Sequence, residues 1–153
     1  MKRDNNIIPL SRDHHYGLLF CWKIRQGIAK GIDPDRIRLY VLDFWKNHLE
    51  RHFLEEETFL FRDVFDPLCT RATEEHRRIQ GLILSIKDGG GWVKNNYTLL
   101  ADLLDKHIRF EERDVFPFLE KRLTGERLSE VGVQLKRLHE QPADDLYEDA
   151  FWN

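Results

Sequence analysis

The sequence His52-Phe53-Leu54-Glu55-Glu56 places a histidine and a glutamate four residues apart. On an α-helix, residues four apart lie about one turn apart on the same face. An imidazole nitrogen and a carboxylate oxygen can then point at one spot, which is how a helix presents two ligands to a metal ion. The stretch therefore predicts a helix whose inner face carries half of a metal site.

The same pattern recurs as His107-Ile108-Arg109-Phe110-Glu111. Each copy lies in a stripe of apolar residues with helical spacing rather than on a polar face. A lone histidine occupies a similar stripe in two further segments, at His15 and at His76. The order His, His-x-x-x-Glu, His, His-x-x-x-Glu predicts two similar helix pairs and a pseudo-two-fold site between them.

Helical periodicity dominates the chain, and no sustained period-two alternation indicates a strand. Ser11 and the Asp33-Pro34 pair are start signals, whereas Pro67 and Gly89-Gly90-Gly91 are stop signals. We expect long helices over about residues 11–30, from 34 to before 67, over 68–87 and over 95–122, with a short fifth helix over 124–140. Pro117 is expected to kink or loosen the last turn of the fourth helix.

Four long helices with short connections predict an all-α fold, an antiparallel up-down-up-down four-helix bundle with a short C-terminal fifth helix. The length of 153 residues suits one domain, 1–153, with the bundle core over about 8–122 and the C-terminal helix and tail over 123–153. The tail is acidic and then aromatic. It is expected to dock either on the bundle or on a partner.

Composition excludes several classes of function. The formal net charge of −3 gives no basic excess for nucleic acid. No apolar run approaches the roughly 18 residues of a membrane span, and the first residues do not resemble a signal peptide. Cys21 and Cys69 do not make a disulfide framework and are expected to be buried small hydrophobes. We therefore expect a cytoplasmic protein with no nucleic-acid or membrane partner.

The polar residues of the inward stripes form one set of candidate metal ligands. The set is His15, His52, Glu56, His76, His107 and Glu111. Four imidazoles and two carboxylates are too many for one four-coordinate ion and suit two ions, with each carboxylate able to bridge them. Mixed nitrogen and oxygen donors without thiolate favour iron or manganese over a structural zinc. A pair of cations would also offset the cost of burying two carboxylates.

Other residues near these stripes are assigned lesser roles. His14 lies about 100° around the helix from His15 and is interpreted as a neighbour of the site. His48, one turn before His52, is a candidate ligand or a buried histidine beside the site. His139 is expected on the surface. Three tyrosines come within reach of the site but are not assigned to it: Tyr16, Tyr40 and Tyr97.

Four stretches together carry a resemblance to a known family. They are Asp13-His14-His15-Tyr16-Gly17-Leu18, His52 to Glu56 with Phe59-Leu60-Phe61, Glu75-His76-Arg77-Arg78-Ile79, and His107 to Glu112 with Val115-Phe116-Pro117. Over about residues 8–122 the chain resembles the hemerythrin-like (HHE cation-binding) domain family. The resemblance implies a four-helix bundle around a non-haem di-iron centre. In that family the lone histidines and both His-x-x-x-Glu motifs ligate iron, and the carboxylates bridge.

The third helix departs from the oxygen-carrying members of that family, which have two histidines four residues apart there. Ala72 and Gln80 occupy the positions four before and four after His76. One iron would then lack an imidazole, which argues against simple reversible oxygen carriage. A vacant position takes water, a small ligand or an oxidant more readily.

Three functions follow as hypotheses. The first is a di-iron protein that binds or senses oxygen, nitric oxide or peroxide, or that handles iron. The second is a di-iron oxidoreductase that reduces nitric oxide or peroxide or repairs iron centres, which would need an electron donor. The third is a metal-free helical interaction module whose inward polar residues bond to one another.

Overall fold

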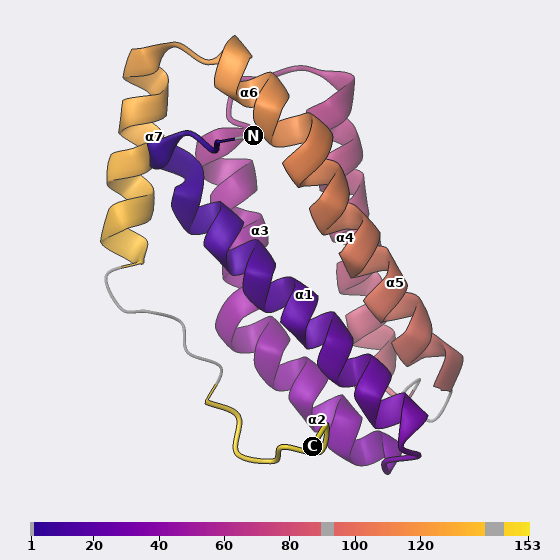
Figure 1. Cartoon of the computed structure of the whole chain (residues 1–153). Coiled ribbons are helices and arrows are strands. Elements are labelled where there is room, and N and C mark those ends of the chain that lie inside the picture. Colours follow the sequence, from indigo (N-terminus) through magenta and orange to yellow (C-terminus); the bar gives the residue numbers. More distant parts are fainter. Residues whose placement is uncertain (1, 90–93, 140–145) are drawn as a thin grey trace.

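A computed structural model describes residues 2–89, 94–139 and 146–153. Within these ranges the regular structure is helical and includes no strand. Four long helical runs pack side by side, and a shorter helix, α7, lies beside one end of the bundle (Figure 1). The all-α fold with a four-helix bundle and a short C-terminal helix is confirmed.

The first two runs contain more helix types than the sequence predicts. A 3₁₀ turn, η1 (Asn5–Ile7), leads into α1 (Ile8–Ala29). The second run comprises α2 (Pro34–Phe44), the π-helical turn η2 (Trp45–Leu49), α3 (Glu50–Glu55) and the π-helical turn η3 (Glu56–Leu60). The start at Asp33-Pro34 is confirmed, because the Asp33 side chain accepts a hydrogen bond from the Asp35 N–H. The start at Ser11 is wrong, because α1 begins at Ile8.

The third and fourth runs follow the same plan. α4 (Pro67–Lys87) is capped by Asp66, which accepts a hydrogen bond from the Leu68 N–H. Gly89 follows it with φ +114°, whereas Gly90 and Gly91 lie outside the described residues. The fourth run comprises α5 (Lys94–Phe110), the π-helical turn η5 (Glu111–Val115) and α6 (Phe116–Arg122). The irregularity expected at Pro117 is therefore a π turn that ends just before α6.

The C-terminal part covers both ends of the bundle. α7 (Gly125–Leu138) begins after Thr124, whose hydroxyl accepts the Arg127 N–H; the expected end at residue 140 lies outside the described residues. Residues 146–153 dock on the bundle near α2 (Figure 1). Phe151 is buried there, and Lys30 Nζ donates to the Trp152 carbonyl at 2.8 Å.

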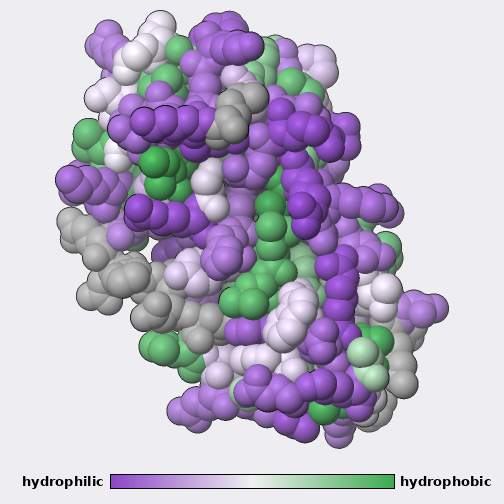
Figure 2. All heavy atoms as spheres, viewed as in Figure 1, coloured by the Kyte–Doolittle hydropathy of each residue, from purple (hydrophilic) through white to green (hydrophobic). Residues whose placement is uncertain are grey.

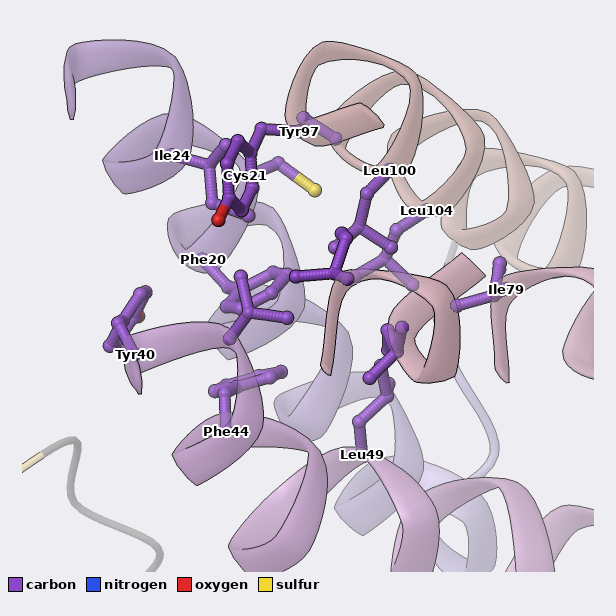
Figure 3. Packing of buried hydrophobic residues seen from close by; sticks show 14 of the residues in the cluster. Phe20, Cys21, Ile24, Tyr40, Phe44, Leu49, Ile79, Tyr97, Leu100 and Leu104 are labelled. Carbon is purple, nitrogen blue, oxygen red and sulfur yellow. The ribbon is translucent and has the colours of Figure 1, made fainter. Parts of the chain in front are cut away.

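Two apolar cores lie along the bundle. The tail-side core joins α1, α2, α4 and α5 to Phe151, and Figure 3 shows its aromatic and aliphatic side chains pointing toward one another. The α7-side core joins the first turns of α1 to α4, α6 and α7. On each run the candidate ligands lie between the two cores. In α1, for example, His14 follows Leu10 of the α7-side core and precedes Phe20 of the tail-side core.

The outer surface is mostly hydrophilic on the face in view, with a narrow hydrophobic band near its centre (Figure 2). Among the described residues, no helix has both the length and the apolar character needed to cross a membrane.

Candidate metal centre

Six buried polar side chains form one layer between the two cores. The layer consists of His14, His52, Glu56, His76, His107 and Glu111, and none is more than 4% exposed. His14 and His52 group with both glutamates, and so do His76 and His107. In each group the ligand-type atoms lie within 4.8 Å of one another. The structure therefore brings together five of the six residues expected from the sequence, with His14 as the sixth.

The prediction that His15 faces the core is wrong, because its side chain is exposed and His14 is buried instead. The buried stripe of α1 runs through Leu10, His14, Gly17, Cys21 and Ile24. Small residues in this stripe let α1 approach α5 closely. A Cβ at Gly17 would lie 2.6 Å from Cδ1 of an α5 isoleucine.

Each glutamate touches histidines of both groups. Glu56 Oε1 lies 3.3 Å from His52 Nε2 and 3.1 Å from His76 Nε2. Glu111 Oε1 lies 3.0 Å from His14 Nε2 and 3.2 Å from His107 Nε2, and its Oε2 lies 3.8 Å from His76 Nε2. Both carboxylates are therefore placed between the two histidine pairs, as bridging ligands would be.

The layer also contains buried polar atoms that lack a hydrogen-bond partner. They are the Nε2 atoms of His52, His76 and His107, both oxygens of Glu56, and Oε2 of Glu111. Buried polar groups in folded proteins are almost always paired, because an unpaired one costs about 1–3 kcal/mol. Inward-facing imidazole nitrogens and carboxylate oxygens are the donors that iron and manganese accept. The residues present therefore fit a pair of cations.

Protonation follows the same layout in the metal-free protein. Burial opposes charge on His52 and His76, but the neighbouring carboxylates raise the pKa of both well above the usual value. Burial likewise opposes charge on Glu111, but His107, His14 and His76 lower its pKa well below the usual value. Charged imidazoles can thus stand in for part of the positive charge that cations would bring.

A family model describes this arrangement. The model of the hemerythrin HHE cation-binding domain matches residues 10–119, which include the whole layer. The chain belongs to the hemerythrin HHE cation-binding family. No curated protein and no solved structure matches the chain. The family resemblance found in the sequence is confirmed, and the match to a cation-binding domain spans every residue of the layer.

Four carboxylates that no sequence motif singled out surround the layer. The Nδ1 atoms of the four buried histidines each face one of them: His14 faces Glu112 at 2.7 Å, His52 faces Asp13 at 3.1 Å, His76 faces Glu57 at 2.7 Å and His107 faces Glu75 at 2.7 Å. Each carboxylate is adjacent in sequence to a residue of the layer, and that adjacency was the available signal. With Nδ1–H donating outward, Nε2 is the atom left to face a metal.

The two glutamates of the layer share a backbone feature. The π-helical turn η3 begins at Glu56, and η5 begins at Glu111. Single π turns are rare and often lie at functional sites. In this hemerythrin domain they support the two-fold repeat that the His-x-x-x-Glu motifs indicate.

The other candidate residues lie outside the layer. His48 packs against Phe44, with ring centroids 5.2 Å apart, and belongs to neither metal-ligating group. Tyr40 and Tyr97 are buried in the tail-side core. Of the two positions four residues from His76, Ala72 is fully buried in the α7-side core and Gln80 is half-buried, so neither adds an imidazole to the layer.

His139 does not lie free on the surface. Its Nε2 is 2.6 Å from Glu55 Oε2 and 3.8 Å from Asp13 Oδ2. Arg51 also pairs with Glu55, at 2.9 Å, and lies 3.9 Å from Asp13. These contacts tie the end of α7 to the bundle.

A small apolar cavity adjoins one side of the hemerythrin layer. It measures about 20 Å³, enough for one water-sized molecule. Four histidines, Asp13 and Tyr16 line it together with apolar side chains; the histidines are His14, His48, His52 and His107, and the apolar residues are Phe44, Leu49, Phe53, Leu104 and Ile108. A small uncharged molecule therefore has space beside the layer.

Proposed function

We propose that this hemerythrin domain is a di-iron protein that binds a small uncharged ligand such as oxygen or nitric oxide. The unpaired nitrogen and oxygen atoms of the buried layer carry this proposal. His14 and His52 would hold one iron, His76 and His107 the other, and Glu56 and Glu111 would bridge. Manganese or zinc would also accept these nitrogen and oxygen donors.

Bound iron would supply redox chemistry and a Lewis acid. The chain's own residues define the surroundings of that chemistry. Phe53 stacks on His76 with centroids 4.0 Å apart, and Phe116 stacks on His14 at 5.1 Å. These rings exclude water from two sides of the layer. The adjoining cavity then favours small neutral ligands, because a charged ligand would lose its hydration on entry.

A di-iron oxidoreductase is the second candidate, and the lack of a second histidine on α4, where Ala72 and Gln80 flank His76 at four residues, favours it. Each ion would have two histidines and two shared carboxylates from the protein. Such a site has room for an oxidant such as peroxide, or for nitric oxide that is to be reduced. This activity, or the repair of iron centres, would need an electron donor from outside the described chain, and hence a protein partner.

Anaerobic loading with ferrous iron tests the proposal. Iron per chain and the visible spectrum are measured before and after addition of oxygen, nitric oxide or peroxide, with His15→Ala as a matched variant. We expect two irons per chain and a reversible spectral change with oxygen or nitric oxide. Turnover of nitric oxide or peroxide with an added reductant would instead support the oxidoreductase, and a chain without iron would refute both.

A further inference from the structure

Four carboxylates, here called the outer carboxylates, form a closed ring around the layer of buried histidines and glutamates: Asp13, Glu57, Glu75 and Glu112. Each reaches from one helical run to the histidine of the next: from α1 to α3, from η3 to α4, from α4 to α5, and from η5 back to α1. Each hydrogen bond thus joins a different pair of neighbouring runs. Correct packing of all four runs is needed to close the ring.

The four histidines nevertheless differ in what else fixes their rings. His14 stacks on Phe116 with an interplanar angle of 10°, and His76 stacks on Phe53 with an angle of 13°. Among the described residues, His52 and His107 have only tilted or edge-on ring neighbours, at angles of 54° to 80°. An aromatic face against the imidazole resists rotation of the ring, whereas an edge contact restricts it less.

One stacked and one unstacked histidine occur in each metal-ligating group. His14 is stacked and His52 is not, while His76 is stacked and His107 is not. The unstacked members are those of the two His-x-x-x-Glu motifs. Their orientation depends on the carboxylate at Nδ1, which is Asp13 for His52 and Glu75 for His107.

We propose that Asp13 and Glu75 are the main positioning residues of the centre, one for each cation. They hold His52 and His107 with Nε2 facing the cation. Glu112 and Glu57 make the same kind of hydrogen bond, but to rings that stacking already holds. This inference rests on the proposed metal site and adds which residues outside the layer set its affinity.

A basic side chain lies beside each of the two carboxylates. Arg71 Nε donates to Glu75 Oε2 at 3.0 Å, which leaves Oε1 for His107. Arg51 lies 3.9 Å from Asp13 Oδ1, beyond hydrogen-bond distance, and Asp13 Oδ2 accepts from His52. The hydrogen bond from Arg71 therefore fixes the orientation of Glu75, whereas the arginine beside Asp13 acts through charge alone.

The physical effect is on the fraction of protein ready to bind metal. An imidazole without its Nδ1 partner can rotate or take the other tautomer, and either change removes the inward Nε2 lone pair. The apparent dissociation constant rises in proportion as the competent fraction falls. Loss of a carboxylate behind a metal-ligating histidine usually weakens metal binding about 10- to 100-fold.

The test compares Asp13→Ala, Glu75→Ala, Glu57→Ala and Glu112→Ala. Ferrous iron is titrated anaerobically against a competing chelator. We expect Asp13→Ala and Glu75→Ala each to raise the dissociation constant of one of the two irons about 10- to 100-fold. Glu57→Ala and Glu112→Ala should raise it by clearly less. Asp13→Asn and Glu75→Gln, which keep an oxygen acceptor, should recover part of the loss. Glu74→Gln changes an exposed neighbour of Glu75 and should match wild type.

A second readout is independent of metal. In the metal-free protein, NMR of the imidazole Nδ1 protons should show loss of the His107 signal in Glu75→Ala and of the His52 signal in Asp13→Ala. The corresponding signals of His14 and His76 should persist. Two tightly bound irons in both alanine variants, with wild-type signals, would overturn the inference but leave the proposed function intact. A wild-type chain without iron would refute the proposed function, and the NMR comparison would still decide whether the two carboxylates orient the rings.

Discussion

The tail-side core and the metal layer are equally buried on the same four helical runs, yet they are held together differently. In the core, side chains such as Phe20 and Phe44 stack with centroids 4.3 Å apart, and apolar contact alone explains the packing. In the layer, several inward nitrogen and oxygen atoms have no hydrogen-bond partner. The core needs no further group, whereas the layer would be completed by the cations that we propose. The bundle should therefore owe part of its stability to metal and part to packing, and variants can separate the two.

Removal of a bridge should have the largest effect. Glu56→Ala or Glu111→Ala should lose both irons, because each takes a ligand from both sites and leaves histidine charge uncompensated. A ligand present at 1,000 times its dissociation constant stabilises by about 4 kcal/mol per site, so a loss of about 8 kcal/mol is expected at such iron concentrations.

The measurement is iron per chain together with the thermal midpoint, with and without a chelator. The chelator should lower the midpoint of wild type and leave that of the variants unchanged. Full iron content in both variants would show that neither glutamate is a ligand.

A cavity in the tail-side core should act through packing alone. Phe20→Ala should lower the free energy of unfolding by about 3–5 kcal/mol, because Phe20 is fully buried. The stabilisation gained from added iron should equal that of wild type. Denaturant unfolding of metal-free and iron-loaded protein measures both quantities, and a variant that folds but no longer gains stability from iron would mean that core and layer are not separable.

The adjacent histidines of α1 give a smaller and more selective effect. His14→Ala should lose about one of the two irons, because only one group contains His14. His15→Ala should keep both, since its side chain is exposed. Iron analysis of the pair decides the point, and the reverse pattern would mean that α1 is rotated in solution.

The pH dependence of the metal-free protein should reveal the charges of the layer. The pKa values of His52 and His76 are raised in the folded protein. The stability that these two charged imidazoles contribute is therefore fully present below about pH 6.5 and is lost as the pH rises through the raised pKa values. The pKa of Glu111 is lowered, so its contribution is present above about 4.5 and is lost as pH falls through the lowered value.

Metal-free stability should therefore decline on the alkaline side. Iron binding should strengthen there, because protons no longer compete for the imidazoles. Thermal midpoints between pH 5 and 9, with and without iron, test this. If the thermal midpoints with and without iron changed in parallel with pH, the predicted competition between protons and iron would be contradicted.

The two thiols should show the least change. Burial raises the pKa of Cys21 and of Cys69 to about 12, so both stay protonated in their apolar surroundings. An alkylating reagent at pH 8 should modify neither thiol in the native protein and both in denaturant. Rapid native modification of Cys21 would show that the tail-side core opens readily.

The sequence predicts the bundle and most of the layer because periodicity and paired motifs report burial directly. His52, Glu56, His107 and Glu111 come in pairs at helical spacing, and His76 lies among isoleucines. The choice of His15 failed for a physical reason. Gly17 and Cys21 are small and carry little hydrophobic signal, although both are buried and Gly17 lies directly against an isoleucine of α5.

The π turns and the outer carboxylates could not be derived in the same way. The π turns that begin at Glu56 and Glu111 change which of the following residues face the core. No local sequence pattern predicts a π turn. The outer carboxylates resemble ordinary solvated charges in the sequence. The contact between Glu75 and His107, which are 32 residues apart in sequence, becomes visible only when α4 and α5 are packed side by side.

Diffraction at the iron absorption edge, on crystals of the iron-loaded protein, tests the central claim most directly. We expect two anomalous peaks per chain inside the layer, one beside His14 and His52 and one beside His76 and His107, with Glu56 and Glu111 between them. A layer without any peak, with its histidines and glutamates bonded to one another, would contradict it.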